Sequence, residues 1–428
     1  MKRMRIATAG ASAGLLAVLS ACGGGGTSEN KSSDDAFVIG VFGPAQIVQG
    51  QDIKAGAELA AKHLNAADGI GGREVSIVFC DTENGAKPEK AVACATKFAE
   101  EDEADAIVGG FSSAEALAAV DTIVKAETLF LGTGAGATDL VKGVDDEGPR
   151  RFIFRVGPVN SLALATDICL AHVGGVAPTA GYTKFGILSE DSEAAVQITE
   201  FLKTCLPDPA GATDGRIDAP GVDLVSVQTH AVDATDFSAQ FRTLENAGAE
   251  YVIEVNSRQV GVALVTQWGQ LKPKFGLGGF NVSSQSDDFY KVTNGGAEGE
   301  LNGPAGVLRT EITAQTIPFY DAFNEMFGHD PIYNAASTYD AVTLLAEAAE
   351  VAGSTKTDDL VDALSEIDYT GVQGRIRFDD SHDVIYGAGD PKEGLSPLHF
   401  QWTKNGDRRV IFPEAFADGP YTPPSWLN

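Results

Sequence analysis

Apolar residues recur along this chain with two spacings that alternate. Short apolar runs such as Phe37–Phe42 are typical of buried strands, whereas in Gly50–Ala67 the apolar residues return at mostly helical spacing. The alternation of strand and helix continues to Leu131, and a second round of it begins at Phe152. Parallel strands need such crossovers, so the pattern predicts an α/β fold with two doubly wound parallel sheets, one in each of two lobes.

The individual elements follow from the same pattern. The predicted strands are Phe37–Phe42, Glu74–Cys80, Ala104–Val108, Leu129–Leu131, Phe152–Val156, Lys184–Leu188, Val222–Val227 and Tyr251–Val255. The predicted helices are Gly50–Ala67, Lys90–Ala99, Ser113–Lys125, Ser161–Val173, Glu193–Cys205, Phe237–Ala247, Val260–Trp268, Ile317–Phe327, Ala335–Val351 and Asp358–Ile367. A final antiparallel pair, Leu398–Thr403 and Arg409–Phe412, is expected to turn at Asn405-Gly406, a typical hairpin dipeptide.

The N-terminus has the pattern of a secretory signal. Lys2, Arg3 and Arg5 precede the apolar stretch Ile6–Leu19, which is too short to span a bilayer comfortably. It runs into Leu-Ser-Ala-Cys, which resembles the bacterial lipobox and implies cleavage before Cys22 and lipid attachment there. Residues 1–21 are therefore predicted to be a lipoprotein signal peptide, and the Gly- and Ser-rich residues 22–36 a flexible tether. A plain signal peptide with an accidental cysteine is the alternative.

Composition excludes some classes of partner. The formal net charge of −29 over 428 residues argues against nucleic-acid binding, which needs clustered Lys and Arg. The six histidines form no H-x-x-x-H spacing, and no G-x-S-x-G elbow is present, so no enzyme, metal or cofactor is expected. The body of the protein is expected to be a monomer outside the cytoplasm, held at the membrane only through a lipid.

Four further cysteines follow Cys22. Their even number in an exported chain suggests two disulfides, for which three connectivities exist. We favour the local pairs Cys80–Cys94 and Cys169–Cys205, because each would stay within one lobe. Free buried thiols are the alternative.

A glycine-rich loop follows the fourth predicted strand. Gly132, Gly134 and Ala137 have the G-x-G-x-x-A spacing of a dinucleotide fingerprint, but Asp139–Arg150 is too broken for a crossover helix. Ligands of open α/β sheets bind beyond the carboxyl ends of strands. The loops 43–49, 110–113 and 132–138 are therefore expected at one ligand-binding edge, where Ser112 and Ser113 begin a helix suited to a small carboxylate. Simple capping of that helix also explains the two serines.

Several stretches taken together resemble a known family. They run from IGVFGPAQIVQGQDIKAGAELAAKHLNAADG to IVGGFSSAEALA, then FRVGPVN, DFSAQFRTLENAGAEYVIEV, YNAASTYDAV and the tail with Pro423-Pro424 and Trp426. In collinear order they resemble the branched-chain amino-acid class of solute-binding proteins, receptors of ABC importers with a periplasmic-binding-protein type I fold. The resemblance implies two lobes that close over a ligand. It places the hinge crossings near Arg155–Pro158, Leu301–Gly306 and Gly371–Arg375.

The resemblance also implies ligand-binding positions. The serine that grips the ligand carboxylate corresponds to Ser113, with Ser112 beside it. The family's Gly-Ala-Thr loop has two possible registers here, Ala135 by order or Ala137-Thr138 by matching letters. The remaining expected contacts are Gln49, Asn160, Asn256, Ser257, Arg258, Phe280 and Asn281. The implied lobes are residues 37–156 with 303–372, and residues 157–302 with 373–428.

Two departures from the family pattern bear on the ligand. Gln49 stands where an aromatic residue often covers the ligand, and the position of a glutamate that often binds the α-ammonium group reads Gly-Gly-Phe280-Asn281. Glu115 is a substitute only if it faces the cleft. A small organic acid, an amide or an aromatic carboxylate is therefore a rival to Leu, Ile or Val. Delivery to an ABC permease is the expected role, and ligand sensing for a signalling partner is the alternative.

Overall fold

Five short strands with nearly continuous apolar runs form the first sheet. They pair in parallel in the order β2-β1-β3-β4-β5, and every residue of β3 and β4 is buried, as expected of a sheet covered on both faces. The strands are β1 Phe37–Gly43, β2 Val75–Asp81, β3 Ala106–Gly109, β4 Leu129–Gly132 and β5 Ile153–Arg155. The structure is a computed structural model that describes residues 36–145, 147–305 and 308–427. The predicted signal peptide, Cys22 and tether lie outside the described residues, apart from residue 36.

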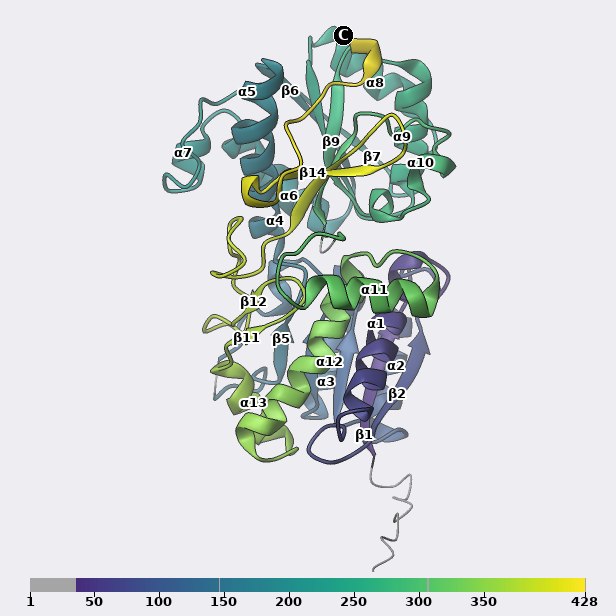
Figure 1. Cartoon of the computed structure of the whole chain (residues 1–428), viewed down its shortest axis with the longest axis vertical. Coiled ribbons are helices and arrows are strands. Elements are labelled where there is room, and N and C mark those ends of the chain that lie inside the picture. The colour runs from purple at the N-terminus through teal and green to yellow at the C-terminus, as the bar shows by residue number, and fades with distance from the viewer. Residues whose placement is uncertain (1–35, 146, 306–307, 428) are drawn as a thin grey trace, which may run out of the picture. The chain divides into compact units, whose positions relative to one another are not determined.

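Helices from both halves of the chain cover this sheet. The N-terminal set is α1 Val48–Asn65, α2 Pro88–Glu100 and α3 Ser113–Lys125; the later set is α11 Thr316–Phe327, α12 Tyr333–Ala352 and α13 Thr357–Ser365. Figure 1 shows α1 and α12 packed side by side, although more than 260 residues separate their first positions. The carboxyl edge of the sheet is thus built by residues far apart in the sequence.

The second sheet has seven strands in the order β14-β13-β10-β9-β8-β6-β7. Its strands are β6 Lys184–Glu190, β7 Asp223–His230, β8 Tyr251–Asn256, β9 Gly276–Asn281, β10 Leu301–Ala305, β13 Leu398–Trp402 and β14 Arg408–Phe412. Its helices are α4 Ser161–Cys169, α5 Ala177–Ala180, α6 Glu193–Cys205, α7 Pro209–Ala212, α8 Ser238–Asn246, α9 Val260–Leu271 and α10 Phe289–Val292. The two predicted parallel sheets and the final antiparallel hairpin are therefore confirmed.

Strand β9 was not predicted, because its glycines are not typical of a strand. A Cβ atom on Gly278 would lie 2.3 Å from the carbonyl oxygen of Leu301, and one on Gly279 would lie 2.2 Å from that of Glu254. Both glycines are needed for close backbone approach to the neighbouring strands, although glycine weakens a strand in isolation. The prediction also lacked β10 and the short helices α5, α7 and α10. A small two-stranded ribbon pairs β11 Tyr369–Thr370 with β12 Arg375–Ile376.

The chain passes between the two sheets after β5, after β10 and after β12. A fully buried ion pair joins the first and third passages: Arg155 Nε lies 2.7 Å from Asp383 Oδ1, and the backbone N–H of Arg155 donates to the carbonyl of His382. These passages coincide only partly with the predicted crossings. The ribbon at 369–376 stays with the first sheet, and the third passage occupies residues 377–397.

The structure contains both favoured disulfides. Cys80 of β2 is bonded to Cys94 of α2, and Cys169 at the end of α4 is bonded to Cys205 at the end of α6. The predicted pairing is confirmed.

The helical run Ser161–Ala180 contains a π-helical segment, Leu170–Val176, between α4 and α5. By length and composition alone it could cross a membrane, but just over half of its most apolar window, 56%, is buried within the fold. It packs against α6, so it is a core helix of the second sheet.

Candidate functional site: a cavity between the two sheets

A cavity of about 80 Å³ lies where strands of both sheets present their carboxyl ends. Residues after β3 and β4 line it from one side, and residues after β6 and β8 line it from the other. Carboxyl ends of parallel strands are where open α/β sheets bind ligands. The lining residues are Phe111, Ser112, Ser113, Ala114, Gly134, Gly136, Pro158, Leu164, Ser192, Glu193, Ala194, Ile198, Ser257, Arg258, Phe280 and Tyr333.

The N-terminus of α3 supplies donors to the cavity. Ser112 caps the helix, its Oγ accepting from the Glu115 N–H at 3.2 Å while Glu115 Oε2 accepts from the Ser112 N–H at 3.1 Å. Ser113 Oγ accepts from the Ala137 N–H at 3.0 Å, which leaves its own O–H to donate. Together with the unpaired first N–H groups of the helix, this suits an anion.

Glu115 is occupied by this capping box. It is fully buried and does not line the cavity, and burial raises the pKa of its carboxyl group although the charge of Arg258 opposes the shift. Glu115 therefore caps the helix through Oε2 and does not line the cavity, so the condition under which it would replace an ammonium-binding glutamate, that it faces the cleft, is not met.

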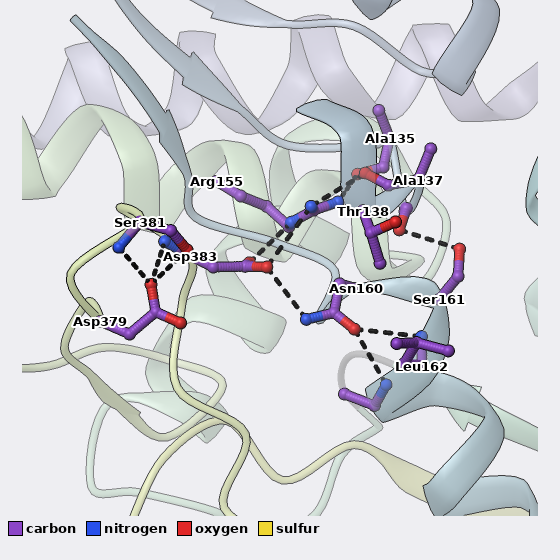
Figure 2. A network of polar contacts seen from close by, with 12 residues as sticks. Ala135, Ala137, Thr138, Arg155, Asn160, Ser161, Leu162, Asp379, Ser381 and Asp383 are labelled. Carbon is purple, nitrogen blue, oxygen red and sulfur yellow. Dashed lines mark hydrogen bonds and ion pairs between the residues drawn. The ribbon is translucent and has the colours of Figure 1, made fainter. Parts of the chain in front are cut away.

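The glycine-rich loop faces the cavity through its glycines, not its alanines. Gly134 and Gly136 line the cavity, whereas the carbonyls of Ala135 and Ala137 point to the buried Arg155, at 2.7 Å and 2.9 Å from its two terminal nitrogens. Figure 2 shows the guanidinium group of Arg155 between these carbonyls and Asp383. Neither register predicted for the loop, Ala135 or Ala137 with Thr138, lies on the cavity wall.

Asn160 belongs to the same buried network. Its Oδ1 accepts from the N–H groups of Leu162 and Ala163 at 3.0 Å, and its Nδ2 donates to Asp383 Oδ2 at 2.9 Å (Figure 2). Asn160 therefore caps α4 and holds Asp383, and it does not line the cavity. Asp379 accepts from the N–H groups of Ser381 and Asp383, as a turn residue does.

The opposite wall consists of separate side chains at the ends of β6, β8 and β9. Arg258 lines the cavity, and its buried Nε atom has no hydrogen-bond partner among the described residues. Ser257 and Ser192 both donate to the buried carboxylate of Glu190. Phe280 adds an aromatic face, so this wall combines one cation with apolar surface.

The remaining predicted contacts lie away from this cavity. Gln49 is buried in α1 with neither amide atom paired to a described residue. Asn256 and Asn281 lie side by side at the ends of β8 and β9 and both donate to Glu254, at 2.7 Å and 3.2 Å. The backbone N–H of Thr138 contacts Gln197 of α6 at 3.4 Å.

Two pairs of cavity residues were not predicted although the sequence contains an indication of their position. Ser192 and Glu193 follow a predicted strand, so the rule that placed Ser113 at the site also applies to them. Gly134 and Gly136 are the glycines of the loop itself. Tyr333 comes from α12, and nothing in its local sequence indicates that it reaches the cavity.

Below the second wall lie two buried carboxyl groups that share a hydrogen bond. Glu254 of β8 and Glu300, next to β10, are both fully buried. Burial raises the pKa of Glu300 to about 7, and burial together with the neighbouring Glu300 raises the pKa of Glu254 well above its ordinary value. At least one of the two therefore carries a proton at neutral pH.

Within residues 36–145, 147–305 and 308–427, no cluster of three or more His, Cys, Asp or Glu side chains could hold a metal ion. The polar groups of the cavity are instead hydroxyls, backbone N–H groups, one guanidinium group and the exposed carboxylate of Glu193. The hydroxyls, N–H groups and guanidinium group are donors that suit a small anion.

The fold and the cavity define a class of protein, the two-lobed binding proteins with a periplasmic-binding-protein type I fold. Solved structures share this fold. The branched-chain amino acid transporter substrate-binding protein LivJ from Streptococcus pneumoniae, in complex with isoleucine, has a TM-score of 0.71 at 20% identity and covers 88% of this chain and 100% of its own. A solute-binding protein of an ABC transporter from R. palustris, in complex with benzoate, has a TM-score of 0.69 at 17% identity, covering 92% and 99%.

The sequence comparisons name the family. The Periplasmic binding protein family matches residues 36–386, and the chain belongs to this family. A curated relative, the Leu/Ile/Val-binding protein homolog 8 of Brucella melitensis, is 23% identical over 380 residues, which are 86% of this chain and 87% of the relative. These relatives are named as binding or transport proteins, and none of those cited is named as an enzyme.

Proposed function

We propose that the protein is an extracytoplasmic receptor that captures a small carboxylate between two lobes and delivers it to the permease of an ABC importer. The observation that carries this proposal is the cavity, in which the N-terminus of α3 with Ser113 faces the unpartnered guanidinium nitrogen of Arg258. A carboxylate placed between them receives charge-assisted hydrogen bonds from both walls.

The solved neighbours support a carboxylate ligand. One was solved with isoleucine and another with benzoate, and the group common to those two ligands is the carboxylate. Much of the remaining lining is apolar, with Phe111, Phe280, Leu164 and Ile198 on the walls. A branched or aromatic side chain fits such a lining.

The lobes that close on the ligand are proposed to follow the division into residues 37–156 with 303–372, and residues 157–302 with 373–428, shifted at two boundaries so that β10 stays whole in the second lobe and the ribbon at 369–376 stays whole in the first. The buried pair of Arg155 and Asp383 ties two of the connecting passages together, so closure would pivot on this point while the loops of each lobe move as units.

A thermal-shift screen of amino acids, amides and small carboxylates tests the binding role. A ligand at 100 times its dissociation constant should add about 2.7 kcal/mol of stability. Ser113→Ala should weaken each true ligand about tenfold or more, because it removes a hydrogen bond to a charged group. Unchanged affinity in this variant would exclude Ser113 from the site, and a screen with no carboxylate hit would reject the proposed ligand class.

Anchoring and delivery need separate tests. The proposed lipid on Cys22 predicts that the wild-type protein sediments with membranes, whereas Cys22→Ala is released in soluble form. A strain that lacks the protein should lose high-affinity uptake of the ligand. Unchanged uptake together with an altered transcriptional response to the ligand would instead indicate a sensing role.

A further inference from the structure

We propose that the cavity selects carboxylates without an α-ammonium group, that is, organic acids in preference to amino acids. This inference rests on the proposed function and names the ligand class of the same site. It follows from the observation that the backbone carbonyls beside the N-terminus of α3 already accept hydrogen bonds from other parts of the protein.

An α-amino acid places two opposite demands on one end of a binding site. Its carboxylate needs donors, and its ammonium group, on the adjacent carbon, needs acceptors within the same small region. If the carboxylate lies at the N-terminus of α3, the ammonium group must find its acceptors there too. The loop Gly134–Ala137 brings backbone acceptors beside this helix end, since Ser113 accepts a hydrogen bond from the loop.

Each of these four carbonyls is already hydrogen-bonded within the protein. Tyr333 Oη donates to Gly134 at 3.3 Å, and Arg155 donates to Ala135 and Ala137. The carbonyl of Gly136 accepts twice, from the N–H of Ser161 at 2.7 Å and from its hydroxyl at 2.9 Å. The loop carbonyls are therefore directed at partners within the protein, which reduces the acceptor capacity left for an incoming ligand.

The charged side chains around the cavity also favour a carboxylate over an ammonium group. Arg155 is fully buried behind the loop, and Arg258 lines the cavity in front of it. An ammonium group in the cavity is repelled by Arg258, whose Nε has no partner among the described residues, whereas a carboxylate is attracted. Asp383 neutralises Arg155 from the side away from the loop, where it cannot act as an acceptor for the ligand (Figure 2).

The acidic groups of the second wall do not replace the missing acceptors. The carboxylate of Glu190 is held by the hydroxyls of Ser192 and Ser257 and does not line the cavity. Glu193 does line it, but it is exposed in the first turn of α6, where solvent screens its charge.

The test compares matched ligands that differ only at the α-carbon. Calorimetric titration of the purified, dialysed protein at neutral pH would use leucine against 4-methyl-2-oxopentanoate and 4-methylpentanoate, and phenylglycine against phenylacetate. In at least one series the acid without the ammonium group is expected to bind tenfold or more tightly than its amino acid. Equal or tighter binding of the amino acid in every series that binds would overturn the inference and leave the proposed carboxylate receptor intact. Binding of no member of either series would reject both.

Tyr333→Phe tests the reason for the preference. The variant removes the hydroxyl that occupies the carbonyl of Gly134 and so gives the cavity a free acceptor. Leucine should gain severalfold in affinity relative to its oxo acid, whereas a purely structural defect would weaken both ligands alike. An unchanged ratio would overturn the role of the occupied carbonyls. Tyr290→Phe, which removes a hydroxyl bonded to Lys404 away from the cavity, is the matched control and should leave the ratio as it is.

Discussion

The two walls of the cavity are built in different ways. The wall from the five-stranded sheet consists of backbone held by a buried network: Arg155 fixes two loop carbonyls, Asp383 fixes Arg155, and Gly134 packs directly on the chain below. The wall from the seven-stranded sheet consists of side chains such as Arg258 and Glu193 that are partly or fully exposed. The first wall is a preformed anchor for one end of the ligand, and the second can vary with ligand type at little cost to the fold.

The largest expected effect lies in the network behind the first wall. Asp383→Ala removes the partner of a guanidinium group with 0% side-chain exposure, and an unpaired buried charge costs about 3–5 kcal/mol of the free energy of unfolding. Urea denaturation measures this loss. The matched control is Asp321→Ala, whose ion pair with Arg309 is 51–59% exposed and should cost less than about 1 kcal/mol. Equal losses in the two variants would show that the network does not support the wall.

The second wall should give the opposite result. Arg258→Gln removes a cation that faces the ligand, so carboxylate affinity should fall about tenfold to a hundredfold, as expected for a hydrogen bond to a charged group. The free energy of unfolding should change by less than about 0.5 kcal/mol, because the side chain is only half-buried and supports no element. Titration and denaturation of the same samples separate the two effects. Loss of stability without loss of affinity would show that Arg258 supports the fold and does not bind the ligand.

The two glycines of the loop offer a sharper contrast within the first wall. A Cβ atom on Gly134 would lie 2.6 Å from the Cα of Phe111, so Gly134→Ala must displace the backbone and should cost about 1–3 kcal/mol. A Cβ atom on Gly136 would meet its nearest atom, Ser161 Oγ, at 3.4 Å, an ordinary contact. Gly136→Ala should therefore leave stability nearly unchanged. Similar melting temperatures for the two variants would contradict the tight packing of this loop.

The smallest expected effect concerns pH and the carboxyl pair below the second wall. Burial raises the pKa of Glu300 from 4.5 to about 7, so the folded protein binds this proton more tightly than the unfolded chain. The resulting stability is fully present below pH 4.5 and is lost as the pH rises through 7. Glu300→Gln, which mimics the protonated group, should stabilise the protein at pH 8 and have little effect at pH 4.5, where the wild-type carboxyl group is itself protonated. A constant difference at both pH values would show that Glu300 does not titrate in this range.

Sequence periodicity predicted most of the fold because strands and helices of α/β proteins differ strongly in apolar spacing. Helices α3 and α6 have the predicted bounds, Ser113–Lys125 and Glu193–Cys205. Periodicity did not predict β9. Its glycines allow close packing against the neighbouring strands, and they stand where strand-forming residues would otherwise be expected.

The site was predictable only where one rule applied, that ligands meet residues following parallel strands. That rule and the family resemblance found Ser112, Ser113, Ser257, Arg258 and Phe280, all of which line the cavity. They could not show that Arg155, at the end of a strand, would bind the loop carbonyls and turn Ala135 and Ala137 away from the cavity. Nor could they bring Tyr333 into the site, because its position depends on the packing of α12 against α1.

The central claim, that this cavity binds a carboxylate, is tested most directly by titrating the wild-type protein with the tightest-binding carboxylate from the screen and with its neutral carboxamide. The two compounds have nearly the same shape and differ in charge. The anion-binding arrangement of Ser113, the N-terminus of α3 and Arg258 predicts that the carboxylate binds at least about tenfold more tightly. Equal affinity for the carboxamide would contradict it.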